Sequence, residues 1–164
     1  MKDRANRLNN TKVWNIILMV ITGISVLWGL LALPSTLNPQ RKAYDYLEEL
    51  GLDPERMYRH ADTLPVKIVF IAGLLLAVGL LFLYFRNHRQ IKNNQLPDKR
   101  PYLIFIGWQI FDMLFSLVYD PMKANQLTFS GIISLLITYL IYCGIPLVIL
   151  NNIRMIEKEQ KLSL

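Results

Sequence analysis

Cysteine and histidine are almost absent from this 164-residue sequence. The one cysteine, Cys143, can form no disulfide or dithiol pair within the chain, which excludes thiol-based electron transfer by the chain alone. The two histidines, His60 and His88, are 28 residues apart, and neither has a second histidine or a cysteine near it in the sequence. The sequence also lacks a glycine-rich phosphate loop and any metal-ligand spacing. We therefore expect no metal site and no cofactor.

Charged residues are also scarce, and their placement is uneven. They make up 18% of the sequence, against about 25% in soluble domains. Three long stretches carry no charge, and a fourth, residues 102–119, carries only Asp112. A helix needs about 20 apolar residues to cross a hydrocarbon core of about 30 Å. The pattern predicts a single all-α integral membrane domain, residues 1–164, with transmembrane helices at about 13–33, 66–85, 102–119 and 128–150.

Lysine and arginine are enriched on one side of this topology. The N-terminus, the segment 86–101 and the C-terminal tail share a side and hold 12 of the 18 basic residues. Because basic residues concentrate on the cytoplasmic side, we expect both termini in the cytoplasm. The net charge of +6 flanks the spans and forms no patch of the kind that binds nucleic acid. Five basic residues of the predicted cytoplasmic loop are expected to face anionic lipid headgroups: Arg86, Arg89, Lys92, Lys99 and Arg100.

The predicted extracytoplasmic loop, residues 34–65, has the punctuation of two short helices. An Asn-Pro pair at Asn38 is typical of a helix start, and Gly51 is typical of a helix end. A second helix is expected from Asp53 to near His60. The first of these helices would present an apolar stripe made of Ala43, Leu47 and Leu50. The loop is thus expected to form a small two-helix cap.

Small residues recur at helical spacing within the predicted spans. Such residues let transmembrane helices approach one another closely. The residues assigned to helix packing are Ser25, Gly29, Gly73, Ala77, Ser134 and Thr138. A kink is expected at Pro146. Six aromatic residues, most of them near span ends, are expected to form interfacial belts: Trp14, Trp28, Tyr84, Tyr102, Trp108 and Tyr119.

Asp112 is the one residue whose placement in a membrane is costly, at roughly 2.5–3.5 kcal/mol when charged. Gln109, Ser116 and Tyr119 share its helical face and complete a polar stripe. No span interior holds Lys, Arg or His, so burial favours the neutral acid. Three roles remain open: a hydrogen bond to the fourth span (Ser134, Thr138, Tyr139 or Tyr142), a proton or cation path, and a salt bridge to a partner's basic residue.

Catalytic motifs of membrane enzymes are not found. The segment beginning at Gly23 lacks the second glycine of a rhomboid-type Gly-x-Ser-Gly turn. Asp112 and Asp120 are eight residues apart, about 12 Å along one helix, which is too far for an aspartyl dyad. We therefore expect no enzymatic activity.

The expected function is that of an accessory or regulatory subunit of a larger membrane complex. The expected contacts are anionic lipids and either another membrane protein or a second copy. A small oligomeric proton- or cation-coupled transporter or channel that uses Asp112 is the alternative. Loops rich in Asn, Lys and Ile favour a bacterial cytoplasmic membrane.

Overall fold

The computed structural model describes residues 2–119 and 129–162. These residues form six helices and no strand. Thr128, the predicted start of the fourth span, lies outside the described residues. The helices are α1 (Lys2–Leu37), η1 (Arg41–Leu50), α2 (Pro54–Ala61), α3 (Leu64–Lys92), α4 (Arg100–Tyr119) and α6 (Phe129–Leu162).

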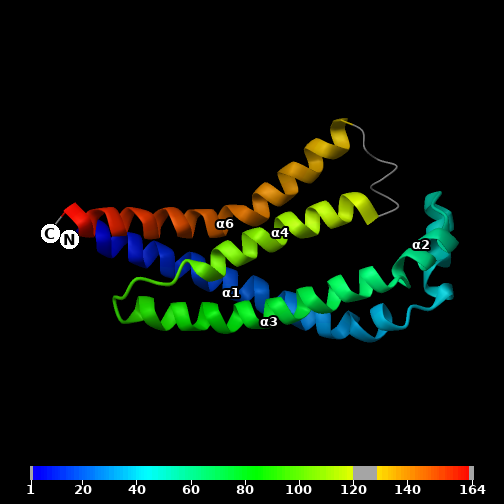
Figure 1. Ribbon diagram of the computed structural model, residues 1–164, viewed down its shortest axis with the longest axis horizontal. Coiled ribbons are helices and arrows are strands. Elements are labelled where there is room, and N and C mark those ends of the chain that lie inside the picture. Colours follow the sequence, from blue (N-terminus) through cyan, green and yellow to red (C-terminus); the bar gives the residue numbers. More distant parts are fainter. Residues whose placement is uncertain (1, 120–128, 163–164) are drawn as a thin grey trace.

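Four of these helices, α1, α3, α4 and α6, are long and apolar enough to cross a membrane. The prediction of an all-helical chain with four such helices is therefore confirmed. Figure 1 shows both termini at one end of the bundle, with α2 at the opposite end. This arrangement follows from four long helices running alternately up and down.

The long helices extend beyond their apolar stretches at the end that holds the termini. Helix α1 begins at Lys2, α3 continues to Lys92 and α6 continues to Leu162. Within the predicted cytoplasmic loop 86–101, only residues 93–99 lie between helices. Hydropathy marks where an apolar run ends, while the helix continues because its polar turns pack together. Leu8, Ile91 and Ile156 form a small buried cluster there, and Arg7 pairs with Glu159 at 3.2 Å.

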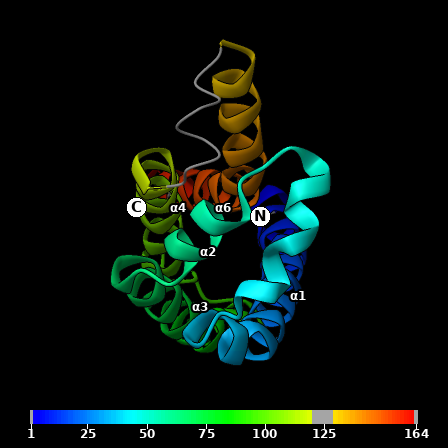
Figure 2. The same ribbon diagram turned by 90° about the vertical axis from the view of Figure 1, so that its right-hand side faces the viewer.

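The main core lies in the same half of the molecule, which we call the terminal half (residues 2–18, 80–102 and 149–162). Its buried residues are Leu18, Leu80, Tyr84, Tyr102, Ile149 and Ile153. In the other half, the cap half, the helices diverge. Helix α6 changes direction in its middle, and its first part stands away from the other helices (Figures 1 and 2). Pro146 lies inside this helix, as expected for a kink.

Helix η1 differs from the predicted first short helix. It is a 3₁₀ helix that begins at Arg41 rather than at Asn38. Side chains four residues apart do not share a face of a 3₁₀ helix, so Ala43 turns away from Leu47 and the stripe predicted from α-helical spacing is wrong. Leu47 is buried, but Leu50 is 66% exposed and Ala43 is also exposed. The ring of Tyr44, three residues before Leu47, instead packs edge-on against Tyr58 of α2, with ring centroids 6.0 Å apart.

The last residue of η1 and the first turn of α2 lie where the sequence predicted them. Gly51 ends η1 with a left-handed φ of 71°, a conformation that glycine adopts without a Cβ penalty. The side chain of Asp53 accepts hydrogen bonds from the backbone N–H groups of Glu55 and Arg56 and so caps α2.

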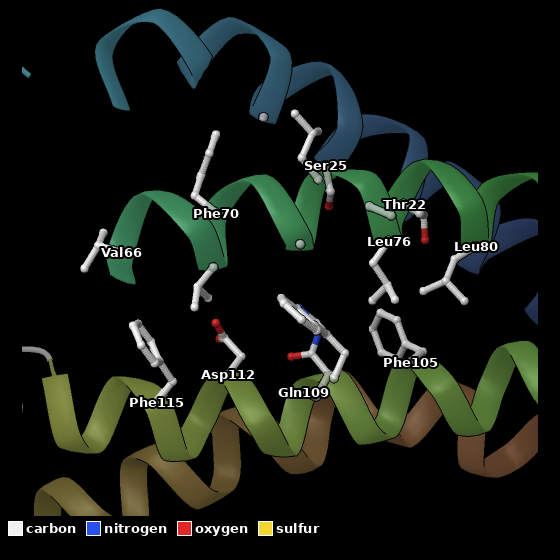
Figure 3. A pocket seen from close by; sticks show the side chains of 16 residues that line it. Thr22, Ser25, Val66, Phe70, Leu76, Leu80, Phe105, Gln109, Asp112 and Phe115 are labelled. Carbon is white, nitrogen blue, oxygen red and sulfur yellow. The ribbon is translucent and has the colours of Figure 1, made fainter. Parts of the chain in front are cut away.

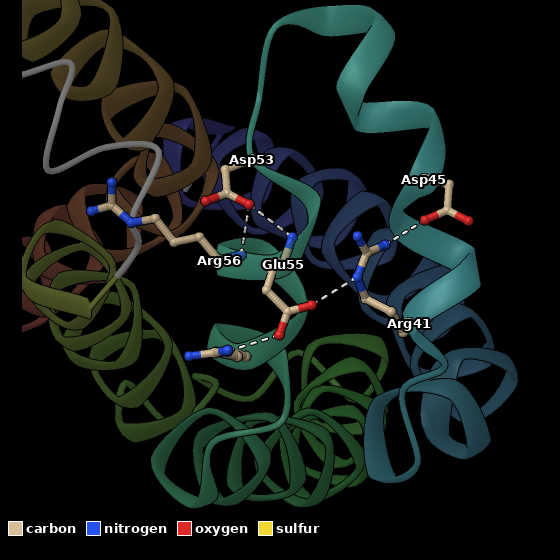
Figure 4. A network of polar contacts seen from close by, with 6 residues as sticks. Arg41, Asp45, Asp53, Glu55 and Arg56 are labelled. Atoms are coloured by element: carbon tan, nitrogen blue, oxygen red, sulfur yellow. Dashed lines mark hydrogen bonds and ion pairs between the residues drawn. The ribbon is translucent and has the colours of Figure 1, made fainter.

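Ion pairs join the two short helices (Figure 4). Glu55 of α2 pairs with Arg59 at 2.8 Å and with Arg41 of η1 at 2.9 Å. Arg41 also pairs with Asp45. The hydrogen bonds from Arg59 and then Arg41 lower the pKa of Glu55 from its ordinary value of 4.5. These exposed pairs fix the relative position of η1 and α2 more than they add stability.

Candidate functional site

A cavity of about 430 Å³ lies between α1, α3 and α4 in the cap half. Thr22, Ser25 and Gly29 reach it from α1, and Gly73 and Ala77 reach it from α3. The close-up in Figure 3 shows α4 contributing Phe105, Gln109, Asp112 and Phe115 along the opposite wall. Residues that the sequence assigned separately to helix packing and to a polar stripe therefore line one cavity.

Asp112 points from α4 toward α3, with Gln109 beside it (Figure 3). One oxygen of its carboxyl group accepts a hydrogen bond of 2.9 Å from the hydroxyl of Tyr139 on α6. Tyr139 is one of the four partners that the sequence allowed. The hydrogen bond joins α4 to the part of α6 that leaves the bundle. A salt bridge from Asp112 to a partner's basic residue stays a prediction.

The predicted polar stripe of α4 divides into two groups. Gln109 and Asp112 line the cavity, whereas Ser116 and Tyr119 are not among its lining residues. Tyr119 is 48% exposed, and its ring stacks on Phe115 with centroids 4.6 Å apart. Tyr119 thus belongs to a row of aromatic side chains along α4.

Two of the glycines in the small-residue stripes stand at close helix approaches. A methyl group added at Gly29 would lie 2.9 Å from Cδ1 of Leu74, and one added at Gly73 would lie 3.0 Å from Cζ2 of Trp108. By contrast, nothing lies within 4 Å at Gly79, which also sits on α3. Gly29 and Gly73 therefore let α3 approach α1 and α4, and the contact at Gly73 holds the indole of Trp108 in the cavity wall.

Ser134 and Thr138 are not packed against another helix of the residues that the structure describes. Both are exposed on the first part of α6, where the hydroxyl of Thr138 donates to the backbone carbonyl of Ser134 at 2.9 Å. Their predicted role in packing α6 against its neighbours is not seen, because α6 turns its Tyr139 face toward α4 and leaves this face outside.

A network of buried hydrogen bonds lies in the terminal half. The hydroxyl of Tyr102 donates to Oδ1 of Asn15 at 2.7 Å, and Nδ2 of Asn15 donates to the backbone carbonyl of Tyr84 at 3.1 Å. Asn87 donates to the Tyr102 hydroxyl at 3.1 Å. It also exchanges two hydrogen bonds with the backbone of Asp98, at 2.8 and 3.1 Å. The network joins α1, α3, the 93–99 segment and α4.

Tyr84 and Tyr102 are fully buried, so their assignment to an interfacial belt is wrong. Their rings stack with centroids 5.6 Å apart inside the core. The sequence analysis also missed Asn15 and Asn87. Asn15 belongs to a series spaced by three and four residues, which lies on one face of α1 and is buried along its length: Leu8, Thr11, Asn15, Leu18 and Thr22.

The five basic residues assigned to lipid headgroups fall into two groups. Arg86 pairs with Asp98 at 3.1 Å, and Lys99 pairs with Glu157 of α6. Arg89, Lys92 and Arg100 are exposed. Arg86 and Lys99 are thus paired with acids of the terminal half, while Arg89, Lys92 and Arg100 face solvent or headgroups.

The hydrogen bond between Tyr139 and Asp112 can be measured through stability. We expect Asp112→Asn to change the free energy of unfolding by less than about 0.5 kcal/mol, since an amide oxygen still accepts from Tyr139. We expect Asp112→Leu to cost about 0.6–1.7 kcal/mol, the range for hydrogen bonds between transmembrane helices. Unfolding in mixed micelles measures both.

Tyr139→Phe should cost about the same as Asp112→Leu, and the variant that carries both substitutions should lose no more stability than either single variant. Additive losses would mean that the two side chains do not interact.

The fold defines the chain as an all-helical protein with four helices that could span a membrane. In the part of the chain that the structure describes, no three His, Cys, Asp or Glu side chains lie close enough to hold a metal ion. The chain matches no protein-family model, no curated protein and no solved structure.

Proposed function

We propose that the protein is a multi-pass membrane protein that acts as a non-enzymatic accessory or regulatory subunit of a larger membrane complex. The observation that carries this proposal is the exposed face of α6 around Ser134 and Thr138. Within lipid, exposed apolar residues are well solvated and need no partner. Small polar residues are different, because in membranes they are concentrated where helices pack together. A face of this kind left open in the single chain fits another transmembrane helix.

The surroundings of this face support the same proposal. The first part of α6 projects from the bundle (Figure 2) and is joined to α4 through Tyr139, so a partner helix can approach its outer side without displacing the chain's own core. Its apolar side chains are 40–69% exposed: Ile133, Leu136, Ile137, Leu140 and Ile141. They would contact lipid or the flanks of the partner helix.

The proposed orientation places both termini in the cytoplasm, in a bacterial cytoplasmic membrane. The excess of basic residues at the end of the bundle that holds the termini supports this orientation. Arg89, Lys92 and Arg100 are the residues best placed to attract anionic lipid headgroups, since Arg86 and Lys99 pair with acids. Helices η1 and α2 would then form a cap on the extracytoplasmic side.

Cysteine labelling in intact cells tests this orientation. In a Cys143→Ser background, Ser35→Cys is expected to react with a membrane-impermeant thiol reagent, and Asn93→Cys is expected to react only after the cells are opened. Both positions are exposed in the fold, so accessibility within the protein does not differ between them. Labelling of Asn93→Cys in intact cells would reverse the orientation.

Affinity purification in mild detergent, followed by mass spectrometry, tests the function itself. The proposal predicts that one or more other membrane proteins co-purify in fixed proportion with the chain. Recovery of the chain alone, or only with copies of itself, would contradict an accessory role in a larger complex.

A transporter or channel that uses Asp112 is the second candidate. It is favoured by one observation, that Asp112 and Gln109 both line the cavity between α1, α3 and α4. Purified chain in sealed vesicles distinguishes the two candidates. A transporter would move protons or cations without any partner, and Asp112→Asn would stop this movement.

A further inference from the structure

We propose that the cavity between α1, α3 and α4 is a binding site for a lipophilic organic cation, with the charged group of the ligand held at Asp112. This inference goes beyond the accessory role and does not depend on docking through α6. It rests on the size and lining of the cavity, on the charge of its walls and on its position below the cap.

The cavity has the dimensions and lining of a small-molecule site. Its volume of about 430 Å³ lies within the range of about 300–1,000 Å³ that is usual for ligand pockets. Most of its lining is apolar, and Phe70, Phe105, Trp108 and Phe115 supply aromatic surface from two helices. Asp112 and Gln109 are polar groups set into this apolar wall (Figure 3). A ligand that fits is therefore largely apolar and carries one polar or charged group.

The ionisable side chains that line the cavity decide whether the charged group of the ligand is positive or negative. Among the described residues that line the cavity, Asp112 is the only ionisable one, and no Lys, Arg or His is present. A carboxylate in a low-dielectric wall interacts much more strongly with a cation than it would in water. Trp108 lines the same cavity, and the face of an indole ring is the strongest natural site for cation–π attraction. A carboxyl group beside aromatic rings without a competing base is suited to an organic cation.

The position of the cavity places one of its ends toward the acidic cap segment. One end is formed by Leu76, Leu80 and Phe105 (Figure 3), and Leu80 belongs to the buried core that contains Tyr84 and Tyr102. This end of the cavity therefore borders the buried core of the terminal half. The other end, near Val66 and Phe115, lies toward the cap. The cap segment, residues 34–65, holds six acidic residues against four basic ones, so its net charge also attracts cations.

Equilibrium dialysis with two ions of the same shape tests the proposal. The purified full-length chain, in a non-ionic detergent, is exposed to tetraphenylphosphonium and, separately, to tetraphenylborate. The two ions share a shape but carry opposite charges, and Asp112 attracts only the cation. We therefore expect the cation to bind at least about tenfold more tightly than the anion. Equal affinity for the two ions, or no binding of the cation, would overturn the proposal while leaving docking through α6 untouched.

Three variants locate the binding. Asp112→Asn should lose at least about tenfold in affinity for the cation while keeping its hydrogen bond from Tyr139 and its thermal stability. Ser25→Phe, at an exposed position of the cavity wall, should weaken binding of the cation by filling the cavity without disturbing the core. Asp45→Asn, at an exposed acid of η1, is the matched control and should change the affinity by less than about twofold. Unchanged binding by Asp112→Asn or Ser25→Phe would show that the cation binds elsewhere and would overturn the proposal.

Discussion

Replacing Asn87 by alanine is expected to lower the free energy of unfolding by about 3 kcal/mol. Asn87 is fully buried and takes part in three hydrogen bonds, two with the backbone of Asp98 and one with the Tyr102 hydroxyl. Alanine would leave the polar groups of Asp98 without these partners at the start of α4. Each buried polar group that loses its partner costs about 1–3 kcal/mol. Unfolding in mixed micelles, followed by circular dichroism, measures the loss.

Asn151→Ala provides the matched control for this prediction. Asn151 also lies on a long helix of the terminal half, but its side chain is exposed. Its replacement should shift the free energy of unfolding by less than about 0.5 kcal/mol. If Asn87→Ala and Asn151→Ala have similar small effects, the buried network does not stabilise the terminal half.

The helices themselves could be predicted from the sequence because their main determinant is local. An apolar run without charge, such as residues 68–85, is readable without any knowledge of its neighbours. The ends of the helices could not be predicted in this way. Residues 2–12 of α1 are polar, and they are helical in the fold because Leu8 and Arg7 find partners on α3 and α6. Such partners are far away in the sequence.

The candidate site was predictable only in part for a related reason. Asp112 is conspicuous in the sequence because a charge in an apolar span is rare. Its partner Tyr139 was one of four polar residues of the fourth span that the sequence offered, but the choice among them depends on how α6 rotates against α4. The cavity depends on the distance between α3 and α4, which packing at Gly73 and Trp108 sets. No local pattern encodes that distance.

Ser134 and Thr138 also show the difference between what a local pattern predicts and what depends on distant segments. Their spacing indicates a helix-packing face, and this reading of the sequence needs no partner to be known. Which helix packs there is a separate question. In the single chain the bend of α6 and the hydrogen bond from Tyr139 to Asp112 direct a neighbouring face toward α4, and the small face remains exposed. The proposal of a docked partner follows from this difference.

Thr138→Trp is therefore expected to reduce the amount of co-purifying partner by at least about tenfold. Thr138 and Ser134 form the exposed small face of α6, and a bulky indole at Thr138 would keep a second helix from approaching closely. Because Thr138 is exposed, the substitution should leave the folding of the chain itself unchanged. The measurement is quantitative mass spectrometry of the complex isolated in mild detergent, normalised to the amount of the chain.

Leu140→Trp separates this effect from a general effect of added bulk. Leu140 is 65% exposed on the same part of α6, but two residues along an α-helix turn the side chain by about 200°, to nearly the opposite face. The variant should therefore retain the partner at the level of the unmodified chain. Equal loss in both variants would indicate that the first part of α6 is merely sensitive to bulk. Full retention in both would place the docking surface elsewhere on the protein, because a partner packed on the face of Thr138 cannot tolerate a tryptophan at that position.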